Sequence, residues 1–112
     1  MKIKQVNIYR EGGVFQKGDL SFEGEIITND SQQGEIDGTG LYAIPGLIDM
    51  HLHGCVGYDF CDGTSEAFDA MTKYQAEHGV TAITPASMTL SKERLKEIFS
   101  AYAAYKGNGG AM

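Results

Sequence analysis

Residues 45–54 read PGLIDMHLHG, and this stretch decides the fold expected for the second part of the chain. Its middle, residues 47–52, is a short apolar run interrupted only by Asp49 and His51, which predicts a buried β-strand. The Pro-Gly pair before the run and the glycines after it are turn signals. The sequence therefore predicts a strand that ends in two histidines, His51 and His53.

The residues that follow predict a helix, a second strand and a second helix. Thr64 or Ser65 can cap the first helix, and Gly79 can end it. The β-branched run over residues 80–84 predicts a buried strand, and Ser91 can cap the second helix. Apolar side chains at helical spacing give each helix one face to bury: Phe68 and Met71 in the first, and Leu95, Ile98, Phe99 and Tyr102 in the second.

This order of elements is the start of a parallel α/β arrangement. A (β/α)8 barrel needs eight such units, or about 250 residues, so two units cannot close one. We therefore expect residues 45–112 to form the first part of an incomplete barrel, and we expect the chain to be truncated at Met112. Apolar faces that other strands would cover are expected to cause self-association or low stability.

Residues 1–44 have a different character, with short alternations of apolar and polar residues between turn signals. Ile3, Val6 and Ile8 follow this alternation, and a last strand is expected over residues 36–44. Turn signals that contain glycine lie between the apolar segments, at residues 11–13, 18–19, 24 and 37–38. Short strands at this spacing predict part of an antiparallel β-sheet or sandwich, which would form a first domain over residues 1–44.

Composition and charge argue against several function classes. The net charge is −6 and the nine Lys and Arg residues are scattered, so nothing favours binding to nucleic acid or to an anionic membrane. No apolar stretch approaches the ~20 residues that cross a bilayer, and the N-terminus lacks the apolar stretch of a signal peptide. A cytoplasmic protein is expected, in which Cys55 and Cys61 are free thiols.

His51 and His53 are the candidate metal ligands. Side chains at positions i and i+2 of a strand point to the same face, so the two imidazoles project together, with Asp49 on the same side. Two imidazoles at the C-terminal end of a parallel strand can bind one Zn²⁺-like ion, and barrel enzymes place their active sites at that end. Histidines at this spacing also occur without a metal, but the preceding turn and the glycines that follow favour a metal site.

The other polar residues near this strand have simpler interpretations. Asp49 is a candidate acceptor for a histidine ring N–H, or a hydrogen-bonding strand residue with no catalytic part, rather than a metal ligand. Cys55 is interpreted as a small buried residue, and His78 as an ordinary helix histidine. Turn and cap chemistry is expected for Asp59, Cys61 and Asp62. A catalytic metal needs more than two ligands, and the sequence offers no convincing further donors.

The chain resembles the amidohydrolase superfamily. Residues 43–54, AIPGLIDMHLHG, are similar to the PGxIDxHxHG signature of that superfamily. Residues 77–89, EHGVTAITPASMT, and residues 54–60, GCVGYDF, resemble its N-acetylglucosamine-6-phosphate deacetylase branch. The resemblance is clearest over residues 34–95.

The resemblance implies a small β-sandwich built from segments on both sides of a metal-dependent (β/α)8 barrel, with residues 45–54 on the first barrel strand. It implies a hydrolase that converts N-acetylglucosamine 6-phosphate to glucosamine 6-phosphate and acetate in amino-sugar metabolism. One or two divalent ions, expected to be zinc, would polarise the amide carbonyl and lower the pKa of the attacking water. His51 and His53 would bind one of the metal positions.

The remaining parts of that machinery would lie beyond Met112. The resemblance implies a metal-binding glutamate, two further histidines, a catalytic aspartate that acts as general acid and base, and the groups that hold the sugar phosphate. Because these groups are expected outside residues 1–112, no catalytic residue is predicted within the chain. The longer enzyme is expected to be a homodimer, and the isolated chain is expected to be inactive.

Two other interpretations stay open from the sequence. Another amidohydrolase would share the His-x-His segment, for example a relative of dihydroorotase or hydantoinase, or an enzyme acting on aminoacyl or dipeptide substrates. The stretch over residues 79–89 argues against those enzymes. A non-catalytic fragment, acting as a metal-binding or interaction module, would show no turnover with any substrate.

Overall fold

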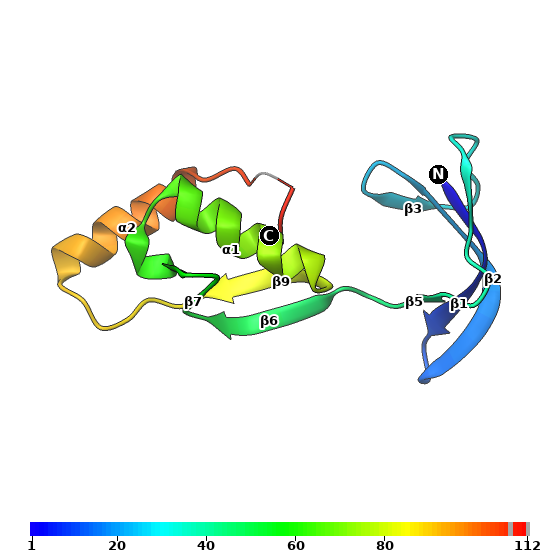
Figure 1. Cartoon of the computed structure of the whole chain (residues 1–112), viewed down its shortest axis with the longest axis horizontal. Helices are drawn as coiled ribbons and strands as arrows, with labels where there is room; N and C mark the ends of the chain where they lie inside the picture. The colour runs from blue at the N-terminus through cyan, green and yellow to red at the C-terminus, as the bar shows by residue number, and fades with distance from the viewer. Residues whose placement is uncertain (108, 112) are drawn as a thin grey trace. The chain divides into compact units, whose positions relative to one another are not determined.

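The computed structural model describes residues 1–107 and 109–111 of the 112-residue chain. Its contacts divide the chain into two compact units, Met1–Pro45 and Gly46–Met112. The first unit is an open β-sheet, and the second combines two short sheets with helices, so the chain is a mixed α/β structure (Figure 1). Neither α-helix of the described residues is long and apolar enough to cross a membrane.

The sheet of the first unit contains five strands: β1 (Lys2–Arg10), β2 (Val14–Glu23), β3 (Ile26–Thr28), β4 (Glu35–Asp37) and β5 (Tyr42–Ala43). β1, β2 and β3 form an antiparallel meander, in which Ile8 lies opposite Gln16. β4 and β5 both pair with β1 in the parallel direction. The expected antiparallel sheet is therefore correct for three strands and wrong for two, because the chain crosses over after β3 and returns alongside β1.

The single strand expected over residues 36–44 is also wrong, since a turn separates β4 from β5. The Asp37 carboxylate accepts the backbone N–H of Thr39 at 2.9 Å and stabilises this turn. A Cβ atom on Gly38 would lie 2.7 Å from Cγ2 of Ile3, so glycine is needed where the turn passes β1. The turn signal at residues 37–38 thus ends one strand before the next begins.

An irregularity in β1 lets β2 continue where a break was expected. The register shifts between Ile3 and Val6, and Gln5 has a φ of 56°, in the left-handed region. The backbone N–H of Gln5 donates to Oδ1 of Asp19 at 3.0 Å. Beyond this bulge Val6 pairs with Gly18, so the expected turn at Gly18 is instead the middle of β2.

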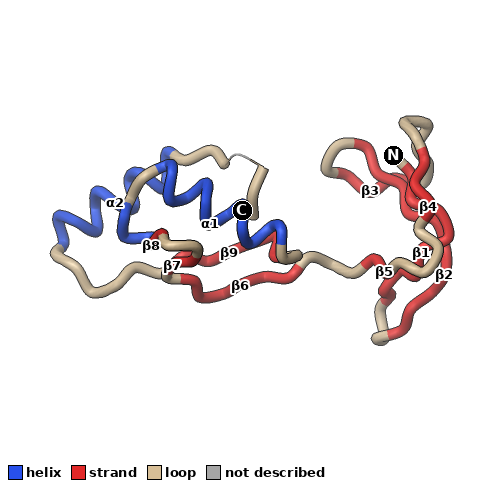
Figure 2. Tube along the Cα trace, viewed as in Figure 1, coloured by secondary structure: helices blue, strands red, loops and turns tan. Residues whose placement is uncertain are grey.

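The second unit contains the order of elements expected from the sequence. β6 (Leu47–Leu52) pairs in parallel with β9 (Val80–Pro85), and α1 (Ser65–Glu77) lies between them in the chain. A hairpin of β7 (Gly54–Cys55) and β8 (Tyr58–Asp59), then the 3₁₀ turn η1 (Phe60–Asp62), lead into α1. α2 (Lys92–Ala104) follows β9. Figure 2 shows α1 alongside β9 and α2 alongside α1.

The helix boundaries follow the predicted caps. Thr64 accepts the N–H of Ala67 at the start of α1, and Ser91 accepts the N–H of Arg94 at the start of α2. After α1, Gly79 takes a φ of 83°, which a residue with a side chain adopts only at a cost. Both predicted N-caps and the predicted stop of the first helix are confirmed.

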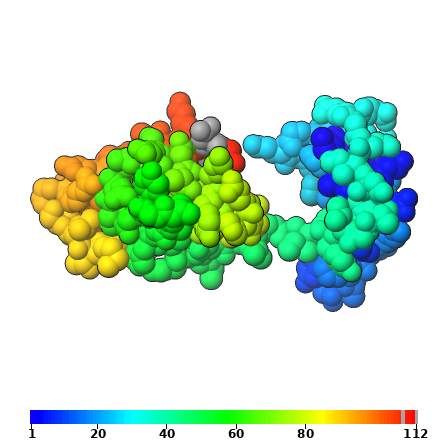
Figure 3. Space-filling view, viewed as in Figure 1, coloured from blue at the N-terminus to red at the C-terminus, as the bar shows by residue number. Residues whose placement is uncertain are grey.

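The core of the second unit lies between the two helices and the β6–β9 pair. Phe60, Phe68 and Tyr102 meet there, with the Tyr102 ring edge-on to both phenylalanines at centroid distances of 5.2 Å. In Figure 3 the atoms of α1, in green, and of α2, in orange, belong to one packed body. Phe99, expected on the buried face of α2, is 50% exposed, whereas Ile98 is fully buried. The buried residues of this core are Leu52, Phe60, Phe68, Met71, Ile83, Ile98 and Ala111.

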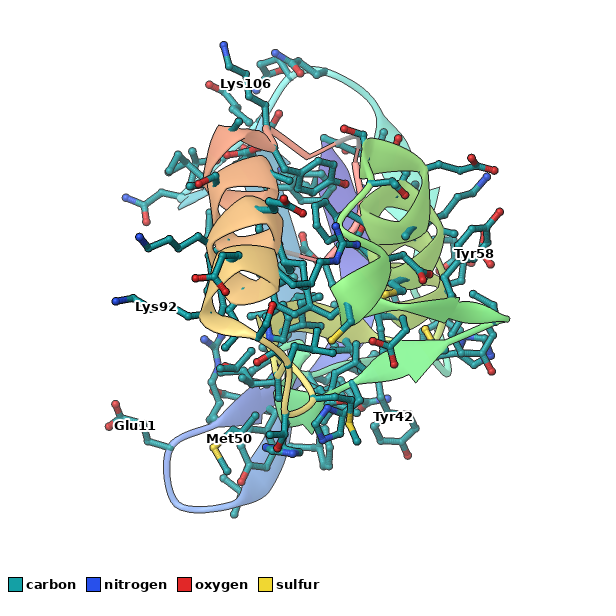
Figure 4. The ribbon with its side chains drawn as sticks, turned by 90° about the vertical axis from the view of Figure 1, so that its left-hand side faces the viewer. Glu11, Tyr42, Met50, Tyr58, Lys92 and Lys106 are labelled. Carbon is teal, nitrogen blue, oxygen red and sulfur yellow. The ribbon has the colours of Figure 1, made fainter. Side chains whose placement is uncertain are left out.

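The expectation that β6 is a buried strand is wrong for most of its length. Ile48 is 67% exposed and Met50 is 79% exposed, and Met50 is labelled in Figure 4. Only Leu52 is buried. The physical reason is that, within the described residues, β6 pairs with β9 alone and therefore keeps one edge and much of its surface open. The run over residues 80–84 is also only partly buried, with Ile83 as its core residue.

Candidate metal centre

The two predicted ligands meet at the C-terminal end of β6. His51 is the last residue but one of the strand, and His53 follows its end. Their Nε2 atoms lie 3.0 Å apart, and their rings meet edge to face with centroids 4.7 Å apart. His51 is exposed and His53 is partly buried. The structure thus brings together the pair that the strand spacing predicted.

A backbone carbonyl orients His53. Nδ1 of His53 lies 2.8 Å from the carbonyl oxygen of Ala86, which can only accept a hydrogen bond. The Nδ1–H tautomer therefore fits this contact, and it leaves Nε2 with a free lone pair directed toward His51. The N–H of Ala86 in turn donates to the carbonyl of Leu52 at 2.9 Å, so both backbone groups of Ala86 hold the end of β6.

Asp49 is a hydrogen-bonding strand residue, which was one of its two interpretations, and is not the ring acceptor. Its Oδ1 accepts the backbone N–H of His51 at 3.0 Å, not a ring N–H. The acceptor for a ring N–H is the Ala86 carbonyl, which the sequence analysis missed. A signal for this contact was present in part, because Ala86 lies two residues after the end of the strand predicted over residues 80–84, and parallel strands end at the same edge of a sheet.

The geometry of the pair fits two of the ligands of a divalent ion. Imidazole nitrogens bind zinc at about 2.0–2.1 Å, so two of them on one tetrahedral ion are about 3.3 Å apart. The observed 3.0 Å between the Nε2 atoms is close to that separation. No group of three or more His, Cys, Asp or Glu side chains suited to a metal ion is found among residues 1–107 and 109–111. The described residues therefore offer two candidate ligands for a metal ion.

The cysteines near this strand are free thiols, as expected. Partial burial raises the pKa of the Cys55 thiol, and the negative charge of Asp49 raises it further. Burial likewise raises the pKa of Cys61, whose sulfur accepts the backbone N–H of Met88. Both shifts favour the neutral thiol, which is a weak metal ligand and a weak nucleophile.

Hydrogen bonds from backbone N–H groups to aspartate side chains stabilise the loop after the histidines, as expected for turns and caps. Asp59 accepts the N–H of Cys61 at 2.7 Å, and Asp62 accepts the N–H of Asp59, which forms a capping box around η1. Gly54 lies directly against the backbone of Tyr58 across the hairpin, where a Cβ atom would clash. Gly54 was expected to let a ligand approach the backbone. The structure shows instead that the close packing of the two hairpin strands requires glycine at this position.

His78 lies apart from this chemistry, as expected. It is exposed at the end of α1, where its Nδ1 contacts the carbonyl of Tyr74 at 2.7 Å and its ring packs on the Tyr74 ring. A histidine in this position donates a hydrogen bond to a carbonyl in the last turn of the helix.

Sequence similarity and structural similarity relate the chain to the same group of known proteins. No protein-family model matches the chain. Over 89 residues the chain is 30% identical to the N-acetylglucosamine-6-phosphate deacetylase of Vibrio furnissii, covering 80% of this chain and 21% of that protein. Over 107 residues it is 32% identical to the N-acetylglucosamine-6-phosphate deacetylase of Haemophilus influenzae, covering 86% of this chain and 28% of that protein.

A solved structure of a protein with the same name also matches the chain. The crystal structure of N-acetylglucosamine-6-phosphate deacetylase from Thermotoga maritima matches 89% of this chain and 26% of its own, with a TM-score of 0.71 and 27% identity. This chain is related to the N-acetylglucosamine-6-phosphate deacetylases. The deacetylase from Pasteurella multocida shares the fold, with a TM-score of 0.78 and 23% identity, over 94% of this chain and 31% of its own.

The match to the deacetylases covers only part of them. The chain spans 15% to 28% of the length of the curated relatives it matches. The described residues form open sheets, whose edges are not joined into a barrel.

Proposed function

We propose that the chain forms part of a metal-dependent enzyme that converts N-acetylglucosamine 6-phosphate to glucosamine 6-phosphate and acetate. The observation that carries the proposal is the approach of the His51 and His53 Nε2 atoms to 3.0 Å, in a chain related to deacetylases of that name. In this proposal the two histidines bind one divalent ion, zinc, at the end of β6. The whole enzyme would be a cytoplasmic homodimer.

The proposed architecture assigns each unit to a part of a larger fold. Residues 1–44 would be a segment of a β-sandwich, and residues 45–112 would be the first two βα units of a (β/α)8 barrel. The parallel pairing of β6 with β9, with α1 between them and α2 after them, supports the second assignment. The exposed edge and surface of β6 are where further strands and helices of a barrel would pack.

The chain's own contribution to the chemistry is to hold two imidazoles. A bound divalent ion polarises an amide carbonyl and lowers the pKa of an attacking water. The Ala86 carbonyl holds the His53 proton on Nδ1, so that Nε2 is free to bind the ion. Two histidines are fewer ligands than a catalytic zinc site uses, so the other ligands and the catalytic aspartate would come from residues beyond this chain.

The decisive experiment reads the coding DNA past the codon for Met112 and expresses the complete reading frame. A product that releases acetate from N-acetylglucosamine 6-phosphate, loses this activity with a chelator and loses it in the His51→Ala variant supports the proposal. A stop codon after Met112, or a complete product without this deacetylation, overturns it. Dihydroorotate, hydantoins and N-acylated dipeptides in the same assay identify a different amidohydrolase.

A second candidate is a non-catalytic zinc-binding fragment. It is favoured by one observation, that no third metal donor joins His51 and His53 among the described residues. Zinc binding by the 112-residue chain, together with no acetate release by it or by the complete reading frame, would support this candidate over the enzyme.

A further inference from the structure

The backbone of β6 is irregular at the candidate metal centre. Asp49 pairs with Ile83 and Leu52 pairs with Pro85, so β6 advances three residues while β9 advances two. The extra residue of β6 therefore lies between Asp49 and Leu52, and His51 belongs to this interval. Bulges of this kind re-aim side chains and are frequent beside active sites.

The side chain of Asp49 closes this bulge. Its Oδ1 accepts the N–H of His51, two residues further along, at 3.0 Å. Contacts of this type compete with the regular ladder and hold the backbone in a local turn. Asp49 takes part in none of the ion pairs found in the described residues, which join Lys2 to Asp30, Lys4 to Glu35 and Arg94 to Glu97.

The bulge accounts for the close approach of the two histidines. In a regular strand, residues two apart are separated by about 6.6 Å along the strand, and their side chains stand roughly parallel. Here the rings meet edge to face with their Nε2 atoms at 3.0 Å. His53 is fixed from the other side by the Ala86 carbonyl, so the ring that must be brought toward it is that of His51.

We propose that Asp49 is a positioning residue for the metal centre. Its carboxylate oxygen holds the N–H of His51, fixes the bulge and so directs the His51 imidazole toward Nε2 of His53. What matters in this role is the acceptor atom, not the negative charge and not a bond to the metal. The inference rests on the proposed metal site for its binding consequence, whereas its structural part concerns the metal-free chain.

Two substitutions separate the acceptor from the charge. Asp49→Asn keeps an oxygen acceptor and removes the charge, whereas Asp49→Ala removes both. Asp37→Ala is a matched control, because Asp37 makes the same contact to the N–H of Thr39 in the other unit. All three variants are made in the 112-residue chain, beside His51→Ala.

The first measurement is amide hydrogen exchange of the metal-free chain by NMR. We expect the His51 N–H to exchange at least about tenfold faster in Asp49→Ala, and at nearly the original rate in Asp49→Asn. The second measurement is zinc affinity by calorimetry, in which Asp49→Ala should bind about 10–100-fold more weakly, Asp49→Asn within about threefold of the original, and Asp37→Ala equally well.

The outcomes are distinguishable. Equal losses of affinity in Asp49→Asn and Asp49→Ala would mean that the charge or direct ligation matters, and would overturn the inference. Unchanged His51 exchange in Asp49→Ala would overturn it as well. If the original chain binds no zinc, the proposed metal site of this chain fails, and hydrogen exchange alone still decides whether Asp49 holds His51.

Discussion

The Nε2 atoms of His51 and His53 lie 3.0 Å apart at the end of β6, with the second ring held by the carbonyl of Ala86. With the His53 proton on Nδ1, Nε2–H of His51 donates to Nε2 of His53. When the His51 proton moves to Nδ1, one nitrogen on each ring is available to the same ion. This relationship is the basis of the first prediction.

Replacing either histidine by alanine should weaken zinc binding by the chain at least about tenfold, because each variant removes one of two converging nitrogens. Calorimetric titration of His51→Ala and His53→Ala with zinc measures this. His78→Ala is the control, since His78 contacts Tyr74 at the end of α1, and it should bind zinc as before. Equal affinity in all three variants would contradict the metal centre.

The aromatic core of the second unit should dominate its stability. Phe68 is 2% exposed, so Phe68→Ala leaves a cavity and should lower the free energy of unfolding by about 3–5 kcal/mol. Phe99 is 50% exposed, so Phe99→Ala should cost much less, about 1 kcal/mol or under. Urea unfolding followed by circular dichroism tests the contrast, and similar losses in both variants would contradict the packing.

The residues that cap the two helices should contribute measurably to the stability of the chain. Thr64→Ala and Ser91→Ala each remove the side-chain oxygen that accepts an N–H of the first turn, and should each destabilise the chain by about 1 kcal/mol. Thr64→Ser keeps the hydroxyl and serves as the control. Thermal unfolding that is the same for Thr64→Ala and Thr64→Ser would show that this cap is unimportant.

The raised pKa of Cys55 predicts a dependence on pH. The folded state holds the thiol proton above the ordinary pKa of 9.0, so it binds more protons than the unfolded state in that range. The stability from this group is therefore complete below about pH 8 and is lost as pH rises through the raised pKa.

Alkylation of the thiols tests this shift. In the Cys61→Ser variant, the reaction of Cys55 with iodoacetamide should reach half its maximum rate at a higher pH in the folded chain than in urea. The same midpoint in both states would contradict the shift.

The exposed surface of β6 should promote association. Ile48 and Met50 are 67% and 79% exposed on a strand with an open edge, and such surfaces pair with other chains. We expect concentration-dependent association of the chain in analytical ultracentrifugation, which Met50→Lys reduces. A monomer at all concentrations with a sharp cooperative thermal transition would refute this expectation.

Local signals in the sequence determined the helix boundaries and predicted which two histidines lie together. Thr64, Ser91 and Gly79 act on backbone groups within a few residues of themselves, so the helix boundaries could be placed without knowing what packs on them. The spacing of His51 and His53 likewise predicted that both rings lie on one face of a single strand, although not that their Nε2 atoms meet.

Tertiary structure decided everything that depends on residues far apart in the chain. The parallel pairing of β4 and β5 with β1, the exposure of Ile48 and Met50 and the hold of Ala86 on His53 each depend on which segment lies alongside. Strand pairing joins residues that a local pattern does not connect, and burial depends on how many neighbours a strand has. For these reasons the sequence predicted a metal-binding pair, and only the folded chain revealed the carbonyl and the bulge that orient it.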